Sequence, residues 1–131
     1  MKKFLVVAVL AVVLSMVTSC LVKETCDVVI SHTEKLSDFS GDDSDLEQYQ
    51  AESKKVRDAF DNAFNASGLE VMAGRLVLRN QTNNQKAISE AKAIGDKANA
   101  SLSGFTARWR ITVEITVSSS FGEEVVATYK Y

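Results

Sequence analysis

The chain has no proline, one histidine and two cysteines among its 131 residues. Without proline, no segment can serve as a stiff proline-rich spacer. A zinc site would need His32 and carboxylates alone, and two cysteines outside any CxxC pair do not build a disulfide scaffold. The P-loop, GxGxxG, HExxH and GxSxG motifs are all missing. We therefore expect no metal, no cofactor and no enzymatic activity.

The chain also lacks an excess of positive charge. It carries 15 basic and 17 acidic side chains, for a formal net charge of −2. Proteins that bind nucleic acid need a basic patch to neutralise phosphates, so we expect no nucleic-acid partner. The length allows no more than one domain.

The first twenty residues have the order of a secretory signal peptide. Lys2 and Lys3 precede an unbroken apolar run from Phe4 to Leu14, and small and hydroxyl residues follow as far as Cys20. A transmembrane helix needs about 18 or more apolar residues, and this run is shorter and is broken by Ser15. A buried core segment is disfavoured because nothing in the charged start begins a domain.

The segment Val17-Thr18-Ser19-Cys20 resembles the lipobox of bacterial lipoproteins. The resemblance implies transfer of diacylglycerol to the Cys20 sulfur, cleavage before Cys20, and acylation of the new amino group with a fatty acid such as palmitate. Leu21 stands where an aspartate would retain an enteric-type lipoprotein in the inner membrane, which favours the outer membrane, facing the periplasm or the cell surface. The alternative is an ordinary secretory signal cut near Ser19, which would leave Cys20 as a free thiol.

Cleavage before Cys20 would remove two lysines and no acidic residue, which leaves 13 basic and 17 acidic side chains. A mildly acidic chain without a polybasic segment has no electrostatic attraction to anionic headgroups. The acyl chains would have to supply the membrane anchor, at about 0.8 kcal/mol per buried methylene.

We divide the chain into three parts: a signal peptide over residues 1–19, an acylated cysteine with a flexible tether over residues 20–41, and an α+β globular domain over residues 42–131. The tether is mostly polar, although Val28-Val29-Ile30 could form a short edge strand. Cys26 is interpreted as a small apolar residue at the edge of this tether, which also contains His32.

Two helices are predicted. The first begins near Ser44, where Ser44 and Glu47 have capping-box spacing, and it ends at Gly68. Its core-facing stripe recurs at spacings of three and four: Leu46, Tyr49, Ser53, Val56, Phe60, Ala63 and Phe64. The aspartates before it lack the spacing of a calcium loop, and capping explains them without a metal.

The second helix opens with Thr82-Asn83-Asn84-Gln85, which also has capping-box spacing, and ends at Gly104. Small residues dominate its apolar side and would let it pack closely on a sheet: Ile88, Ala91, Gly95, Ala98 and Leu102.

Three strands are predicted around these helices. Residues 69–79 form a strand with a bulge at Ala73-Gly74, because the apolar residues change parity there. Residues 105–117 alternate strictly between apolar and polar side chains, with Trp109 on the core side. A last strand buries Val125, Ala127, Tyr129 and Tyr131 and pairs with the previous one as a hairpin.

This order predicts a two-layer α+β fold, with two helices on one face of a small three- or four-stranded mixed or antiparallel sheet that ends in a C-terminal β-hairpin. The C-terminal strand is expected between the other two, as in split βαβ arrangements.

The polar face of the sheet is the candidate binding surface. We expect a protein or glycan partner and no chemistry, as in an envelope accessory, immunity or surface-binding lipoprotein. The alternatives are a carboxylate-dependent envelope hydrolase and a homo-oligomer. The residues of this candidate face are Arg108, Arg110, Thr112, Glu114, Thr116, Thr128 and Lys130.

Overall fold

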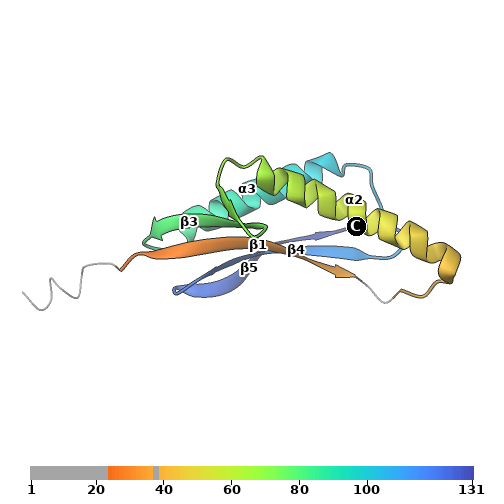
Figure 1. Cartoon of the computed structure of the whole chain (residues 1–131), viewed down its shortest axis with the longest axis horizontal. Helices are drawn as coiled ribbons and strands as arrows, with labels where there is room; N and C mark the ends of the chain where they lie inside the picture. Colours follow the sequence, from red (N-terminus) through yellow and green to blue (C-terminus); the bar gives the residue numbers. More distant parts are fainter. Residues whose placement is uncertain (1–23, 37–38) are drawn as a thin grey trace, which may run out of the picture.

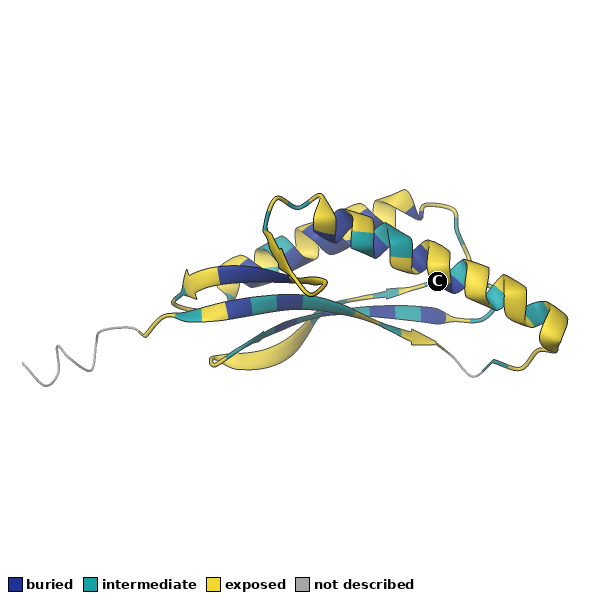
Figure 2. Ribbon diagram, viewed as in Figure 1, coloured by how far each residue is buried: buried dark blue, intermediate teal, exposed yellow. Residues whose placement is uncertain are grey.

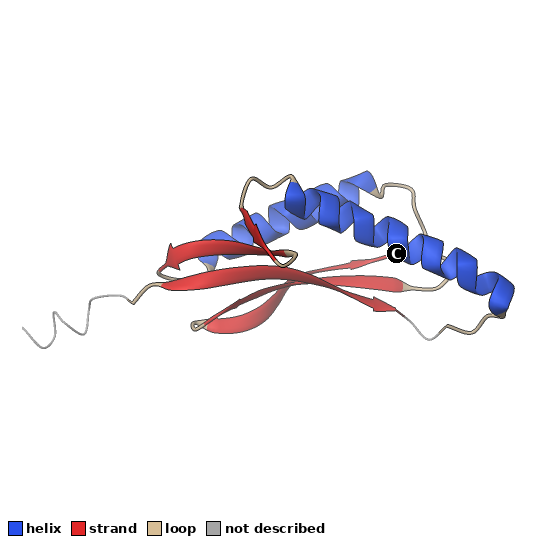
Figure 3. Cartoon of the chain, in the orientation of Figure 1, coloured by secondary structure: helices blue, strands red, loops and turns tan. Residues whose placement is uncertain are grey.

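The computed structural model describes residues 24–36 and 39–131, which form a two-layer α+β domain. Both helices lie on one side of a five-stranded antiparallel sheet (Figures 1 and 3). The elements are β1 Cys26–Leu36, α2 Asp43–Asn65, β2 Glu70–Met72, β3 Arg75–Gln81, α3 Gln85–Ser101, β4 Ile111–Ser119 and β5 Gly122–Lys130. The α+β class and the C-terminal hairpin are confirmed, but the sheet has five strands rather than three or four. The signal peptide predicted over residues 1–19 and the predicted lipidation site Cys20 lie outside the described residues.

Strand β1 is the central strand of the sheet, which corrects the prediction of a flexible tether over residues 20–41. The strand order is β2-β3-β1-β4-β5, and β1 pairs antiparallel with both β3 and β4. Val28 and Ile30 are completely buried. The polar residues that follow them suggested a solvated segment, but His32 and Glu34 have partners on α2. The folded domain therefore includes Cys26–Leu36, and β5 lies at an edge of the sheet instead of between other strands.

The predicted bulge at Ala73-Gly74 is a hairpin turn between β2 and β3. Ala73 has φ 52° and Gly74 has φ 76°, and Met72 pairs directly with Arg75. A two-residue hairpin turn of type I′ has positive φ at both central residues, a conformation that glycine tolerates best. The chain reverses here, so the change of parity in the sequence comes from a turn and not from an inserted residue.

Helix α2 is capped by Asp42, two residues before the predicted position. The Asp42 Oδ1 atom accepts from the backbone N–H groups of Ser44 (3.0 Å) and Asp45 (3.1 Å), and Asp45 Oδ2 accepts from the Asp42 N–H at 3.2 Å. This reciprocal arrangement satisfies free amides at the helix start. It also accounts for the aspartates at this position.

The capping box predicted for the second helix does not form. The N-cap of α3 is Asn84, which makes no side-chain capping hydrogen bond. Asn83 Oδ1 accepts from the Gln85 N–H at 2.9 Å instead.

The hydrophobic core lies between the sheet and the helix layer, where Figure 2 shows the buried segments of both helices and of the central strands. Its largest fully buried side chains are Phe60, Ile30, Leu76, Ile111, Ile115, Val28, Val56, Val113 and Val117. On α3 the small residues Ala91, Gly95 and Ala98 are buried as predicted, and Ala87, which the prediction left out, is buried as well, whereas Ile88 is half-buried. Of the predicted α2 stripe, Leu46 is exposed, because the first turns of α2 extend past the sheet. Within residues 24–36 and 39–131, no helix is long and apolar enough to cross a bilayer.

Strand β4 begins at Ile111, so the predicted strand over residues 105–117 is a loop in its first part. Trp109 lies in that loop, is half-buried and is not part of the core, contrary to the prediction. Its indole ring contacts the rings of Phe39 and Tyr49, with centroids 5.0 and 5.8 Å away.

Strand β5 contains an irregularity that the sequence did not indicate. Ile115 pairs with Ala127 whereas Thr116 pairs with Val125, so β5 has one extra residue between the two pairs. Val126 therefore packs against the core and Val125 is 50% exposed. Ala127, Tyr129 and Tyr131 pack against the core as predicted, and Val125 does not.

Candidate functional site

One face of the sheet has no helix over it among the described residues (Figure 1). Because successive side chains of a strand point to opposite faces, the residues between the buried core positions share this surface. We call it the open face. Its side chains come from all five strands and are Asp27, Val29, Ser31, Thr33, Lys35, Glu70, Met72, Arg75, Val77, Arg79, Thr112, Glu114, Thr116, Ser118, Glu123, Val125, Thr128 and Lys130.

Five of the seven residues predicted for the binding surface lie together on the open face. Thr112 pairs with Lys130 across β4 and β5, Glu114 pairs with Thr128, and Thr116 lies further along β4. The register of the hairpin places them side by side, because its paired residues point the same way.

The two arginines predicted for the same surface do not lie on these strands. Arg108 is in the loop before β4, where its Nη1 donates to Asp45 Oδ1 at 2.7 Å and its guanidinium lies 4.7 Å from the Trp109 ring centroid. Its backbone N–H donates to Glu52 Oε2. Arg108 thus ties the loop to α2. Arg110 is exposed at the end of the same loop.

Strand β1 adds a row of hydroxyl and charged groups that the sequence reading had assigned to the tether. Ser31 pairs with Thr116, and Thr33 pairs with Glu114. Lys35 Nζ lies 2.9 Å from Glu114 Oε1 and neutralises the central carboxylate of the face. The middle of the open face is therefore rich in hydroxyl groups and has little net charge.

A second ionic group lies towards β2 and β3. Arg79 Nη1 is 2.7 Å from Asp27 Oδ2, and Arg79 Nη2 is 2.9 Å from Glu70 Oε1. Hydrogen bonds from Arg79 lower the pKa of both carboxyl groups below their ordinary values. All three side chains are exposed, so water screens these interactions and their net contribution is small. Asp27 and Arg79 are far apart in sequence, and only the pairing of β1 with β3 brings them together.

The other polar group lies between β1 and α2. His32 Nε2 is 2.8 Å from Asp61 Oδ1, while His32 Nδ1 is buried without a hydrogen-bond partner among the described residues. Beside it, Glu34 accepts from Ser53 Oγ at 3.0 Å and from Arg57 Nε at 3.1 Å. Ser53 bonds to Glu34 and not to His32, so these residues do not form the serine–histidine–carboxylate relay of a hydrolase.

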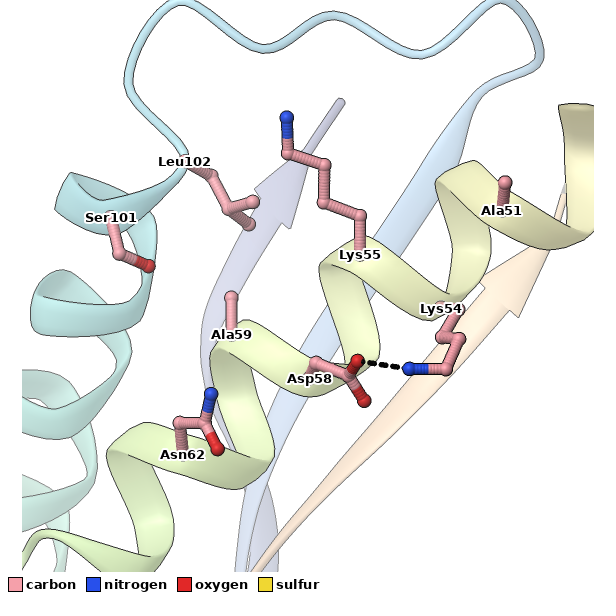
Figure 4. A pocket seen from close by; sticks show the side chains of 8 residues that line it. All are labelled: Ala51, Lys54, Lys55, Asp58, Ala59, Asn62, Ser101 and Leu102. Atoms are coloured by element: carbon pink, nitrogen blue, oxygen red, sulfur yellow. Dashed lines mark hydrogen bonds and ion pairs between the residues drawn. The ribbon is translucent and has the colours of Figure 1, made fainter.

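The outer surface of the helix layer has a shallow depression of about 510 Å³ between α2 and the end of α3 (Figure 4). Lys54 Nζ lies 2.6 Å from Asp58 Oδ2, and Lys55 extends over the depression (Figure 4). Asp58 is the one carboxylate among the residues that line it, which are Ala51, Lys54, Lys55, Asp58, Ala59, Asn62, Ser101 and Leu102. General acid–base hydrolysis of glycosides uses two facing carboxylates, and this depression does not supply a pair.

No described part of the chain gathers three or more histidine, cysteine or carboxylate side chains in a geometry that could hold a metal ion. Cys26, at the start of β1, is half-buried and is a free thiol.

No family model, no curated protein and no solved structure matches this chain.

Proposed function

We propose that the protein is a lipid-anchored lipoprotein of the bacterial outer membrane whose folded domain binds a macromolecular partner, without chemistry of its own, through the open face. The anchor is the Cys20 of the segment that resembles a lipobox. The partner is a protein or a glycan of the envelope, and the role is that of an envelope accessory, immunity or surface-binding factor.

The observation that carries this proposal is the one-sided helix layer. A sheet covered on one face only leaves a broad, mostly polar surface, and the open face spans five strands. Its charged groups are largely paired with one another, as in Lys35 with Glu114 and Arg79 with Asp27. Such a surface suits a partner recognised over a large area by hydrogen bonds, because its hydroxyl groups can donate and accept.

The test is affinity capture of the full-length lipidated protein from its own membranes. Thr116→Arg combined with Thr128→Arg places two bulky cations in the middle of the open face. Neither side chain is buried, so the free energy of unfolding should change by no more than about 0.5 kcal/mol per substitution. The proposal predicts that the partner recovered with the parent protein is lost with this double variant.

The matched control carries Ser89→Arg and Ala93→Arg, both at exposed positions of α3 on the opposite side of the molecule. It introduces the same charge and should retain the partner. Equal recovery with both variants would remove the open face as the binding surface.

A further inference from the structure

The second half of β1 has a free edge. Strand β3 pairs with β1 from Cys26 only as far as Ile30, whereas β4 pairs with β1 on the other side as far as Leu36. Within residues 24–36 and 39–131, no strand pairs with Ser31–Leu36 on the β3 side. In Figure 1 the arrow of β1 runs well past the β2–β3 hairpin.

A free edge of this kind offers main-chain hydrogen bonds to an incoming strand. In an antiparallel strand, the N–H and C=O groups of every second residue bond to one neighbouring strand, and those of the residues between them point to the opposite edge. Along Ser31–Leu36 these groups face the position that a continuation of β3 would occupy. Extended peptides bind other domains by adding a strand at such an edge, with pockets for alternate side chains.

A groove runs along this edge between β1 and α2. It consists of two adjoining depressions of about 570 and 370 Å³ that share Leu36 and Arg57. We call it the edge groove. The other lining residues that matter for recognition are His32, Glu34, Tyr49, Lys54, Asp58 and Asp61. These volumes fit individual side chains of one added strand, and they are too small for the helix layer of a second domain.

The two ends of the edge groove differ in chemistry. At one end the groove is lined by Tyr49, and Leu36, which is 43% exposed, lies where the two depressions meet, so that the two side chains provide an apolar region. At the other end Asp61 has a side chain that is 49% exposed and contacts the His32 ring. Asp58 pairs with Lys54, and Glu34 pairs with Arg57. Asp61 contacts His32 and has no lysine or arginine partner among the described residues.

We propose that the edge groove binds an extended segment of a partner protein, which adds to Ser31–Leu36 as a strand antiparallel to β1 and in line with β3. Side chains opposite His32, Glu34 and Leu36 point towards α2, because directly paired residues share a face. The segment therefore carries an apolar side chain opposite Leu36 and a basic side chain opposite His32, within reach of Asp61. This site uses the main-chain edge of β1 and the side of that strand that faces α2, shares Thr33 with the open face, and stands whether or not that face binds anything.

The experiment selects a phage-displayed library of random linear peptides on the full-length protein in detergent micelles. The best peptide is then synthesised and its affinity is measured. The proposal predicts enrichment of peptides that combine apolar and basic residues on one face of a strand. It also predicts slower amide hydrogen exchange at alternate residues of Ser31–Leu36 when the peptide is bound.

Asp61→Asn removes the charge while keeping the shape of the side chain, and it should weaken the peptide at least tenfold. The control Asp43→Asn removes a charge at the exposed start of α2, away from the edge groove, and should leave the affinity unchanged. Exchange protection of the core residues Val113 and Ile115 verifies that both variants are folded.

Three results would overturn the proposal. The first is a selection in which no peptide is enriched, or in which the bound peptide protects β4 or β5 instead of β1. The second is equal affinity of the Asp61→Asn and Asp43→Asn variants. The third is protection of Ser31–Leu36 that rises with protein concentration without peptide, which would show that a second copy of this chain occupies the edge.

Discussion

Gly95 of α3 lies directly against Tyr129 of β5. A Cβ atom added to Gly95 would be 2.5 Å from the Tyr129 hydroxyl oxygen and 2.6 Å from Ile115 Cδ1. The same hydroxyl donates to Asp96 Oδ1 at 2.8 Å. This contact sets how closely α3 packs on the C-terminal hairpin, and it gives the small residues of α3 a structural reason.

Gly95→Ala should destabilise the domain. Alanine favours a helix over glycine by about 1 kcal/mol, but overpacking a well-filled core costs about 1–3 kcal/mol. The side chains facing the new methyl group cannot move aside freely, because Ile115 is completely buried and the Tyr129 hydroxyl is bonded to Asp96. The contacts at 2.5 and 2.6 Å place the overpacking cost in the upper part of that range, so we expect a net loss of about 1–2 kcal/mol in urea denaturation. Ser89→Ala at an exposed position of the same helix is the control and should be neutral or slightly stabilising. A Gly95→Ala variant as stable as the parent would mean that α3 does not pack this closely.

The two C-terminal tyrosines should make stability fall at alkaline pH. Burial raises the pKa of Tyr131 to about 12, and burial together with the hydrogen bond to Asp96 raises the pKa of Tyr129 further. In the unfolded chain tyrosine titrates near 10, so above that pH the folded state binds more protons than the unfolded state. The free energy of unfolding should thus decline as the pH rises from about 10 through about 12.

Tyr129→Phe and Tyr131→Phe should each flatten this decline, measured as the urea midpoint against pH. Curves that remain parallel to that of the parent would show that the tyrosines titrate equally in both states.

A chain that begins at Asp42 should not fold. The truncation removes β1, which supplies the buried residues Val28 and Ile30 and joins β3 to β4. A chain that begins at Glu24 keeps the whole sheet and should give a cooperative urea transition with the far-ultraviolet circular dichroism of an α+β protein. A cooperative transition in the shorter chain would mean that the domain folds without residues 26–36, as expected for a tether.

Trp109→Ala and Phe60→Ala should differ in cost. Phe60 is completely buried, and such truncations cost about 3–5 kcal/mol. Trp109 is half-buried beside Phe39 and Tyr49, so its loss should cost no more than about 2 kcal/mol, mainly from lost area and ring contacts. Thermal unfolding of the two variants measures the difference. A larger effect at Trp109 than at Phe60 would contradict the loop position of the tryptophan.

Local patterns of apolar residues correctly predicted the helices and strands in which the apolar spacing matches the buried face. The spacing of Val56, Phe60 and Ala63 placed one face of α2 in the core, and the alternation of Ile111, Val113 and Ile115 predicted β4. The same alternation continues back to Phe105, but strand pairing stops at Ile111. Periodicity alone does not show where a partner strand ends, so Arg108 and Trp109 were assigned to a strand.

Long-range pairing decided the features that the sequence did not predict. Residues Ser31–Leu36 are mostly polar, and nothing local shows that β4 pairs along their whole length. The partners of His32 and Glu34 lie on α2, many residues away. At Ala73-Gly74 a bulge and a turn fit the pattern equally well, and the pairing of β2 with β3 distinguishes them. Of the open face, proposed as the binding surface, the β4–β5 part was predictable from the sequence and the β1 part was not.

The lipid anchor is the central claim about where this protein acts, and the chemistry at Cys20 tests it most directly. Cells expressing the parent protein, Cys20→Ser or Cys26→Ser are labelled with a fatty-acid analogue, and the N-terminal peptide of the mature protein is identified by mass spectrometry. The lipobox resemblance predicts an acylated Cys20 at the mature N-terminus of the parent and of Cys26→Ser, because Cys26 is a free thiol in β1 and follows no apolar signal core. Cys20→Ser should be unlabelled and remain an uncleaved precursor or a soluble secreted form. An unlabelled parent protein, or a peptide in which Cys20 forms a disulfide with Cys26, would contradict the lipoprotein assignment and the membrane location with it.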